Sequence, residues 1–430
     1  MSSTRFVAYI AAALAGLSLL AARAPAPYPL DGYEHNGIRR LRAYRLIQEG
    51  KMPGSLTLPP GALLPSAAIT LRLAGVNDSY DLSDDAQKDP DLQSAIERIV
   101  GRRDSSYRIA LLDISDPLQP RYAAVKADQG YIPGSVGKLL VLTGLFNELR
   151  KLYPEDVEAR AALLRNTRVV ADRFVIPNSH AVPVVADDWS GVTHRAIRVG
   201  DEFTLWEWVD HMVSPSSNAA GSTVWKEALL INVFGHDYPP TRAQEDSFFK
   251  NTPAAELSDR SIRILEEPLL EAGLDTTRLR QRTFFTNTAS RIIPGKSSYC
   301  TPQELVHWLL KLEQGKLVDR WSSLEMKKLI YFTRRRYRYA SSPRLDEAAV
   351  YFKSGSLYRC KEDEGYECGQ YRGNVENLMH SVAIVESPAS GTNQRVYLIS
   401  MMSNVLKVNS AWEHMEIAGR IEDLIERMHP

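Results

Sequence analysis

Three long apolar runs dominate the last third of the chain. They cover residues 348–358, 378–387 and 395–404, and turn-rich segments separate them. Runs of this length between turn signals are typical of buried β-strands. The connecting loops are short, which favours antiparallel pairing over crossover connections. A final amphipathic stretch at 411–428 predicts a helix that closes the chain.

Two further strands are expected much nearer the N-terminus. Residues 107–115 and 121–127 have strand-like patterns, and the turn-forming sequence DPLQP separates them, so they predict a hairpin. A helix is expected just before it, at 90–102, where Asp91 can act as the N-cap and apolar residues recur at helical spacing.

The middle of the chain predicts mainly helices and loops. From Ser135 to about Leu152, leucines and a phenylalanine fall on one helical face. Further helices are expected at 204–213, which Pro215 ends, and at 302–313. We find no internal repeat.

This order of elements indicates one sheet built from both ends of the chain. We predict an α+β fold in which helices flank a mostly antiparallel five-stranded sheet, with an all-helical lobe (about residues 135–315) inserted between the strands. This domain would span residues 91–430. Residues 25–90 are rich in Pro and Gly, with one expected helix at 37–49, and are interpreted as an extension packed on the domain.

The first 24 residues have the pattern of an export signal. The 17 residues from Phe6 to Ala22 carry no charge and lie between Arg5 and Arg23. Cleavage after Ala24 would require attack on an Ala-Pro bond, so an uncleaved membrane anchor is the alternative, although a span normally needs about 20 residues. Both interpretations place the protein outside the cytoplasm, in the periplasm or cell envelope.

The overall charge gives no sign of a nucleic-acid partner. The chain has 52 basic and 52 acidic residues. The strongest basic run, TRRRYR at 333–338, is expected to be a solvated helix face or turn. His194, His211 and His380 lack metal-site spacing, so neither a metal nor a cofactor is expected.

The three cysteines do not form a zinc motif or a disulfide scaffold. Cys360 and Cys368 flank an acidic loop and are candidates for a disulfide in an oxidising compartment. Cys300 is expected to be a small buried residue.

The segment GYIPGSVGKLL (130–140) invites comparison with a phosphate-binding loop. That motif requires glycine where Ile132 stands and Ser or Thr where Leu139 stands, so we reject it. Ser135 and Lys138, three residues apart at a helix start, remain. A lysine with a lowered pKa can accept a proton from such a serine, and the helix N-terminus favours developing negative charge.

Two other segments contain candidate polar groups. HMVSPSSNAA (211–220) places Ser216 and Asn218 just after a helix, as either a capping cluster or a hydroxyl and an amide that act on a substrate. YFKSGSL (351–357) places Lys353 and Gly355 on a strand. That lysine is either solvent-facing on an edge strand or beside a ligand that glycine allows to approach.

Taken together, Ser-x-x-Lys, Ser-x-Asn and Lys-Ser-Gly resemble the motifs of the penicillin-recognising serine hydrolases, the class A β-lactamases and D-Ala-D-Ala peptidases. The segment before Ser-x-Asn, GDEFTLWEWVDHMV, and the segment IPGKSSYCTPQELVHWLL (293–310) also resemble this family. The resemblance extends from about Leu92 to the C-terminus.

The resemblance implies a catalytic role for five residues. Ser135 would be the nucleophile and Lys138 its base. Ser216, helped by Lys353, would pass a proton to the leaving nitrogen, and Asn218 would hold the substrate's amide side chain.

The resemblance also implies a binding role for the strand around Gly355. Backbone N–H groups of Ser135 and Ser356 would form the oxyanion hole. Ser354 and Ser356 would contact a substrate carboxylate near Lys353. Tyr131 is a candidate for the cleft lining, with core packing as the alternative.

One departure from the family concerns release of the acyl group. Class A β-lactamases carry a glutamate in the omega loop that activates water. Alignment on Ile293-Pro294-Gly295 puts Thr286 there, and neither Asp nor Glu occurs between Asp275 and Glu304. An ester on Ser135 is therefore expected to hydrolyse slowly.

Two functions are consistent with these patterns. The first is an exported, monomeric serine hydrolase that attacks a β-lactam or a D-Ala-D-Ala-type peptide of the cell wall. The second is a sensing or binding module that keeps the fold, becomes acylated and does not turn over.

Overall fold

The computed structural model describes residues 31–82, 87–333 and 336–430. The predicted export segment lies outside these ranges. Within them, no helix combines the length and apolar character needed to cross a membrane.

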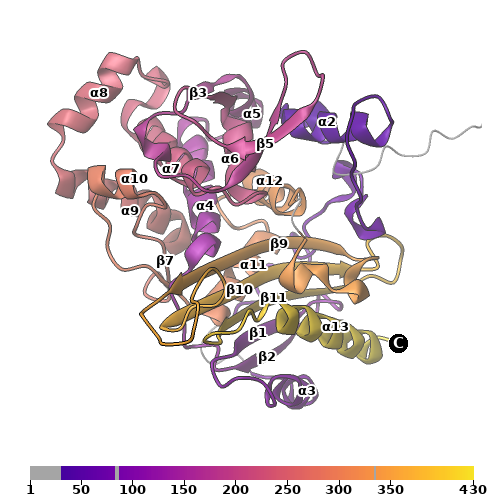
Figure 1. Cartoon of the computed structure of the whole chain (residues 1–430). Helices are drawn as coiled ribbons and strands as arrows, with labels where there is room; N and C mark the ends of the chain where they lie inside the picture. The colour runs from indigo at the N-terminus through magenta and orange to yellow at the C-terminus, as the bar shows by residue number, and fades with distance from the viewer. Residues whose placement is uncertain (1–30, 83–86, 334–335) are drawn as a thin grey trace, which may run out of the picture.

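The sheet has five strands in the order β2-β1-β11-β10-β9, and every neighbouring pair is antiparallel (Figure 1). The strands are β1 (Arg108–Asp113), β2 (Arg121–Val125), β9 (Ala349–Arg359), β10 (Glu376–Ser387) and β11 (Arg395–Asn404). The prediction of one antiparallel sheet built from both chain ends is confirmed. Strand β9 lies at an edge, which leaves one side of it open to other parts of the chain.

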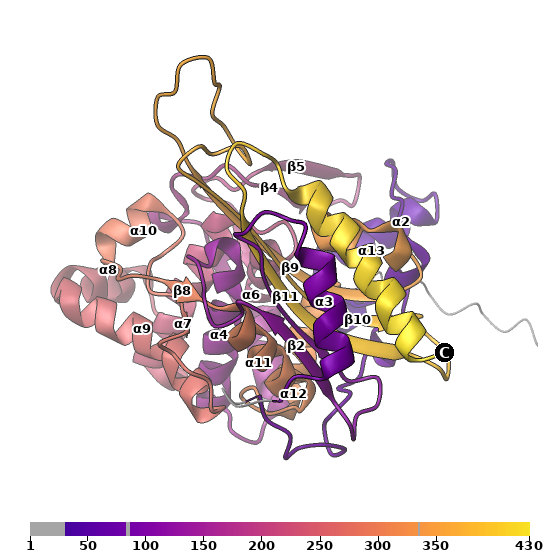
Figure 2. The ribbon, with the colours of Figure 1, turned by 90° about the horizontal axis from the view of Figure 1, so that it is seen from below.

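Each face of the sheet packs against a different set of helices. Ile109 and Leu111 point into a core with α3 (Pro90–Val100) and α13 (Ala411–Met428), whereas Ala110 and Leu112 belong to the core on the opposite face. Figure 2 shows α3 and α13 together on one side and the helical lobe on the other.

The N-cap of α3 differs from the expectation. It is Asp89, whose carboxylate accepts the backbone N–H of Leu92, and not Asp91. The proline that follows Asp89 occupies the first helical turn, where its missing N–H costs nothing.

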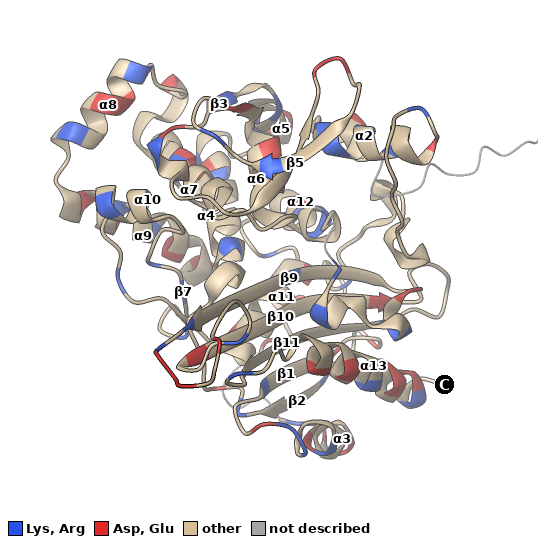
Figure 3. Ribbon diagram, viewed as in Figure 1, with Lys and Arg blue, Asp and Glu red and all other residues tan. Residues whose placement is uncertain are grey.

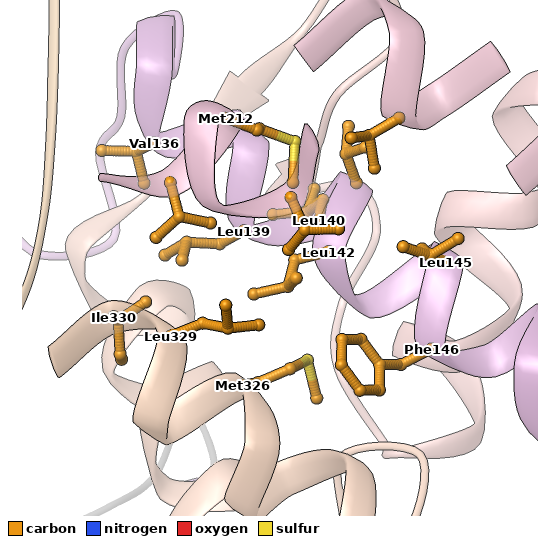
Figure 4. Close-up of a cluster of buried hydrophobic side chains, with 14 of the residues drawn as sticks. Val136, Leu139, Leu140, Leu142, Leu145, Phe146, Met212, Met326, Leu329 and Ile330 are labelled. Carbon is orange, nitrogen blue, oxygen red and sulfur yellow. The ribbon is translucent and has the colours of Figure 1, made fainter. Parts of the chain in front are cut away.

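The lobe is mainly helical and packs around α4 (Lys138–Leu152). Leucines of α4 contact Met212 of one neighbouring helix and Met326 and Leu329 of another (Figure 4). The other helices are α5 (Val157–Asn166), α6 (Leu205–Val213), α7 (Asn218–Phe234), α8 (Arg242–Asn251), α9 (Ala254–Glu271), α10 (Asn287–Ile292), α11 (Pro302–Glu313) and α12 (Arg320–Tyr331).

The lobe is not all-helical, as expected from the sequence, because it also contains three two-stranded sheets. They pair β3 (Arg168–Val170) with β6 (Glu202–Thr204), β4 (Ala181–Val185) with β5 (Val192–Ala196), and β7 (Leu279–Arg280) with β8 (Tyr299–Cys300). Strands of two or three residues, such as β3, β6, β7 and β8, are too short for a period-2 pattern to reveal them.

The segment before α3 is joined to the body by buried contacts. It contains α1 (Tyr33–Asn36) and α2 (Arg39–Gln48). Arg40 of α2 forms a bidentate ion pair with Asp210 of α6, and both side chains are buried. Leu41 and Leu73 belong to the main core, so these residues are part of the folded unit.

Candidate active site

Ser135 lies in a short turn that strand β9 holds in place. Residues Gly134–Gly137 form a single 3₁₀ turn, and the regular helix α4 begins only at Lys138. Gly134 has a φ of +54°, and a Cβ there would lie 3.0 Å from the carbonyl oxygen of Ser356. The backbone beside the serine therefore lies directly against β9, and glycine permits both the conformation and the approach.

Lys138 is buried and contacts Ser135 directly. Its Nζ lies 2.9 Å from Ser135 Oγ, 2.6 Å from the carbonyl oxygen of Ser216 and 2.7 Å from Oδ1 of Asn218. Burial, and secondarily the nearby Lys353, hold the pKa of Lys138 well below its usual value. A lowered pKa favours the neutral amine, and a neutral amine can accept the serine proton.

Ser216 connects the two lysines. It lies between α6 and α7 with a φ of +63°, and Lys353 donates from Nζ to its Oγ at 2.7 Å. Burial, together with the charge of Arg338, lowers the pKa of Lys353 to about 7. The side chains of Ser135, Lys138, Ser216 and Lys353 thus form one continuous hydrogen-bonded chain.

The three residues of the Ser-Ser-Asn segment have different surroundings. Ser217 is the N-cap of α7 and accepts the N–H of Ala220. Ser216 and Asn218 face Lys138 instead. The capping serine positions its two neighbours at the site.

Strand β9 places its Ser-Gly-Ser run beside the nucleophile. A Cβ on Gly355 would lie 2.5 Å from the carbonyl oxygen of Pro133, so only glycine allows this approach. Ser354 Oγ lies 2.5 Å from the phenol oxygen of Tyr337. Ser135 and Ser356, the expected oxyanion-hole residues, line the same cavities.

Two cavities meet at Ser135, and Asn218, Ser356 and Leu357 line both of them. The first has a volume of about 470 Å³ and includes Phe284, Phe285 and Lys296. The second, of about 680 Å³, extends past Ser216, Tyr337 and Ser354 to Tyr371. Among the described residues that line either cavity, none is Asp or Glu.

Thr286 does not face the site. It is buried, its hydroxyl donates to the carbonyl of Phe174 at 2.6 Å, and it contacts Ser222 Oγ at 3.0 Å. The preceding residue, Phe285, lines the cavity instead, and the centroid of its ring lies 5.0 Å from Nζ of Lys138. An apolar ring therefore occupies the side of Lys138 that faces this loop.

Tyr131 is the one predicted site residue that the structure places elsewhere. Its phenol donates to the carbonyl of Ser106, and its ring lies against Arg108 and His380. It lines neither cavity at Ser135, so its expected place in the cleft is wrong and the packing alternative holds.

The basic run at 333–338 is not a solvated face at its C-terminal end. Arg338 is buried and donates from Nη1 to the carbonyl of Gly355 at 2.6 Å. Its guanidinium lies over the rings of Tyr337, at 5.0 Å, and Tyr371, at 5.3 Å. Sequence reasoning missed these three residues, because an arginine-rich run gives no sign that one member is buried.

The cysteines pair as expected. Cys360 and Cys368 form a disulfide, and Cys300 is buried and free. The bond closes the acidic loop between β9 and β10 (Figure 3), and two residues beyond Cys368 the chain reaches the second cavity at Gln370. In the part of the chain that the structure describes, no cluster of three His, Cys, Asp or Glu residues could hold a metal ion.

The chain is similar to a protein family and to several solved structures. Residues 264–423 match the model of a β-lactamase enzyme family. The TLA-3 extended-spectrum β-lactamase is 14% identical with a TM-score of 0.50, and the match covers 78% of this chain and 98% of that one. PBP-A, in an acyl-enzyme complex with penicillin G, is 15% identical with a TM-score of 0.49, covering 79% and 98%.

The β-lactamase of Sphaerobacter thermophilus is 12% identical with a TM-score of 0.48, covering 77% and 94%. No curated protein sequence matches. At these identities the TLA-3 likeness establishes the fold. The family match over residues 264–423 and the fold both support the superfamily of β-lactamases and penicillin-binding proteins that the motifs predicted. The match supports the expectation of a serine β-lactamase-like hydrolase.

Proposed function

We propose that the protein is an exported serine acyl-transfer enzyme that attacks the amide bond of a β-lactam or a D-Ala-D-Ala-type peptide through an ester on Ser135. The observation that carries this proposal is the contact of Ser135 Oγ with the buried Nζ of Lys138 at the meeting point of two cavities. A capping serine followed by a solvated lysine would leave that lysine exposed.

Acylation needs two proton transfers, one away from the Ser135 hydroxyl and one to the leaving nitrogen of the substrate. Ser135 Oγ attacks the substrate carbonyl carbon and gives its proton to Nζ of Lys138. The backbone N–H groups of Ser135 and Ser356 stabilise the negative charge on the carbonyl oxygen. When the C–N bond breaks, Ser216 Oγ protonates the leaving nitrogen and recovers a proton from Lys353, 2.7 Å away.

Release of the acyl group is the slow step in this proposal. Hydrolysis needs a base that deprotonates water beside the ester. On the omega-loop side, Phe285 faces Lys138, and the hydroxyl of Thr286 is engaged with Phe174 and Ser222. An apolar ring cannot activate water, so we expect the acyl-enzyme to accumulate.

Intact-protein mass spectrometry with penicillin G tests the proposal. Opening of the β-lactam ring releases no fragment, so the expected mass increase is that of the whole penicillin molecule. Ser135→Ala should show no adduct, and Ser217→Ala, the capping residue, should still be labelled. Lack of an adduct on the wild-type protein, or an adduct that persists in Ser135→Ala, would contradict the proposal.

The second candidate is a sensor or binding module that is acylated without turnover, which the apolar side chain beside Lys138 favours. Stopped-flow kinetics with a chromogenic β-lactam distinguishes the two. An enzyme gives a burst followed by a steady rate, whereas a sensor gives a burst alone. Release of D-alanine from a D-Ala-D-Ala peptide, dependent on Ser135, would also identify an enzyme.

We further propose that residues 1–24 direct export, that the protein acts as a monomer in the periplasm or cell envelope, and that its partners are small β-lactams or cell-wall peptides, not nucleic acid. Cell fractionation with N-terminal sequencing distinguishes a cleaved signal from a retained anchor. Light scattering on the purified protein measures the oligomeric state.

A further inference from the structure

The second cavity has a wall that none of the three motifs accounts for. Arg338 lies beneath strand β9, buried, with a φ of +57°. It donates to the carbonyl of Gly355 and holds one tyrosine ring on each of two segments, Tyr337 from its own segment and Tyr371 from the loop after the disulfide. Both tyrosines line the cavity.

The groups on this wall are hydrogen-bond donors. Tyr337 Oη lies 2.5 Å from Ser354 Oγ, and Ser356 follows two residues later on the same strand. Hydroxyl groups can turn their hydrogens toward an acceptor in the cavity. Because none of the described residues lining this cavity is acidic, nothing there opposes a negatively charged group.

Beside the second cavity, Arg338 carries a more constant positive charge than Lys353. The pKa of Lys353 is about 7, so this lysine is only partly charged at neutral pH, whereas a guanidinium stays charged. Arg338 does not line the cavity. Its charge acts from behind the two rings and the Gly355 carbonyl, in surroundings that screen it little.

The loop that carries Tyr371 is fixed from several directions. The carbonyl oxygen of Tyr371 accepts a hydrogen bond from Nδ2 of Asn377 at 3.1 Å, and Tyr371 has a φ of +63°. Asn374 exchanges two hydrogen bonds with the backbone of Lys361 at the base of the loop. The Cys360–Cys368 disulfide closes the same loop just before Tyr371. The ring is therefore held in place before a substrate arrives.

We infer that Tyr337 and Tyr371 form a specificity site for a carboxylate on the leaving-nitrogen side of the substrate, and that Arg338 and the disulfide-closed loop are the positioning elements that hold the two phenols there. This inference rests on the proposed acylation of Ser135. It adds to the Ser-Gly-Ser strand two residues from outside the motifs, and it makes substrate selectivity depend on an intact disulfide.

Two matched probes test the inference, penicillin G and its methyl ester, which lacks the negative charge. The measured quantity is the second-order rate constant for acylation of Ser135. Tyr337→Phe and Tyr371→Phe should each lower it about tenfold or more for the acid, the scale of one hydrogen bond to a charged acceptor, and leave it within about twofold for the ester. Tyr131→Phe, outside both cavities, should change neither rate.

The disulfide is tested with the same pair of probes. Cys360→Ser combined with Cys368→Ser, or reduction of the wild-type protein, should lower the acid-to-ester ratio while the ester still acylates Ser135. An equal loss for both probes would indicate a merely structural role, and an unchanged ratio in all these variants would overturn the inference. If neither probe labels the wild-type protein, it is the proposed function that fails.

Discussion

Lys138 and Lys353 are both buried within hydrogen-bond distance of Ser216, and burial together with the charge of Lys353 lowers the pKa of Lys138. Water normally keeps a lysine charged, and desolvation removes that advantage. The pKa of Lys138 is lowered by burial first and by the charge of Lys353 second. Both pKa values therefore lie below that of a solvated lysine, which makes the neutral amine more available.

This arrangement predicts an unusual pH dependence of acylation. Lys138 must be neutral to take the proton of Ser135, so the acylation rate should rise with pH and level off well below 10.5. In Lys353→Met the neighbouring charge is lost, and the midpoint should move to higher pH. Acylation rates with the uncharged methyl ester, measured from pH 5 to pH 10, check both statements. A wild-type midpoint near 10.5 would contradict them.

Lys353 also affects stability. An unfolded lysine titrates near 10.5, whereas the folded one titrates at about 7. The free energy of unfolding therefore decreases as the pH falls below about 10.5, and the decrease levels off below pH 7. Lys353→Met should therefore raise the melting temperature at and below pH 7. The gain in the free energy of unfolding should be on the order of a few kcal/mol, before the cost of the lost hydrogen bonds is subtracted. The gain should vanish near pH 10.5. Calorimetry at pH 6 and pH 10 measures the difference, and a destabilised variant at pH 6 would contradict this account.

Gly355 controls how closely the nucleophile approaches β9. The Cβ of an alanine would lie 2.5 Å from the Pro133 carbonyl oxygen and would push the turn that carries Ser135 away. A shift of about 1 Å costs on the order of a hundredfold in rate, so Gly355→Ala should lose at least that much acylation. Gly191→Ala, where a Cβ meets nothing within 4 Å, is the control. Equal acylation rates in the two variants would refute the argument.

At the scale of single elements, the omega-loop segment offers a test of which residue faces the site. Phe285→Glu would place a carboxylate next to Lys138, where a base can activate water. Hydrolysis of the acyl-enzyme should become faster by up to about a hundredfold, the lower end of what general-base catalysis contributes. Thr286→Glu is the matched control, because its side chain points into the buried contacts with Phe174 and Ser222. It should destabilise the protein without faster release. The decay of the acyl-enzyme mass peak measures both, and faster release in Thr286→Glu alone would overturn the assignment.

The same two residues show where sequence reasoning ends. Period and turn signals predict the five sheet strands and the helices α11 and α13, because long elements repeat their pattern many times. The resemblance of the motifs to those of a known family also implies that Ser135, Lys138, Ser216 and Lys353 come together. An irregular loop, however, has no fixed side-chain period, so alignment could not tell whether Phe285 or Thr286 faces Lys138.

Burial of charge was the other property that the sequence could not supply. Arg338 lies in a run that is typical of a solvent-facing segment, and its neighbours along the chain do not bury it. The groups that do are Gly355 and Tyr371, 17 and 33 residues later in the chain. Contacts of this range depend on the tertiary fold and leave no local pattern.

At the scale of the whole molecule, a buried ion network connects the N-terminal extension to the rest of the fold. Lys327 of α12 contacts Glu313 of α11 and Glu386 of β10, and all three side chains have 0% exposure. Arg72 of the extension reaches the same Glu386 at 2.5 Å. Two carboxylates and two cations thus balance one another, and the extension supplies one of the cations.

Removal of the central cation should destabilise the protein more than any surface charge change. Lys327→Met leaves Glu313 and Glu386 buried with only Arg72 to neutralise them, which should cost about 3–5 kcal/mol in the free energy of unfolding. Arg72→Gln should cost less, because Arg72 is 25% exposed and water can partly replace it. Arg242→Gln breaks an exposed ion pair with Asp246 and should change stability by less than about 0.5 kcal/mol. Urea unfolding of the three variants gives the ranking. If Lys327→Met were as stable as Arg242→Gln, the network would not hold the extension to the body, and residues 31–82 would have to be attached mainly by their apolar contacts.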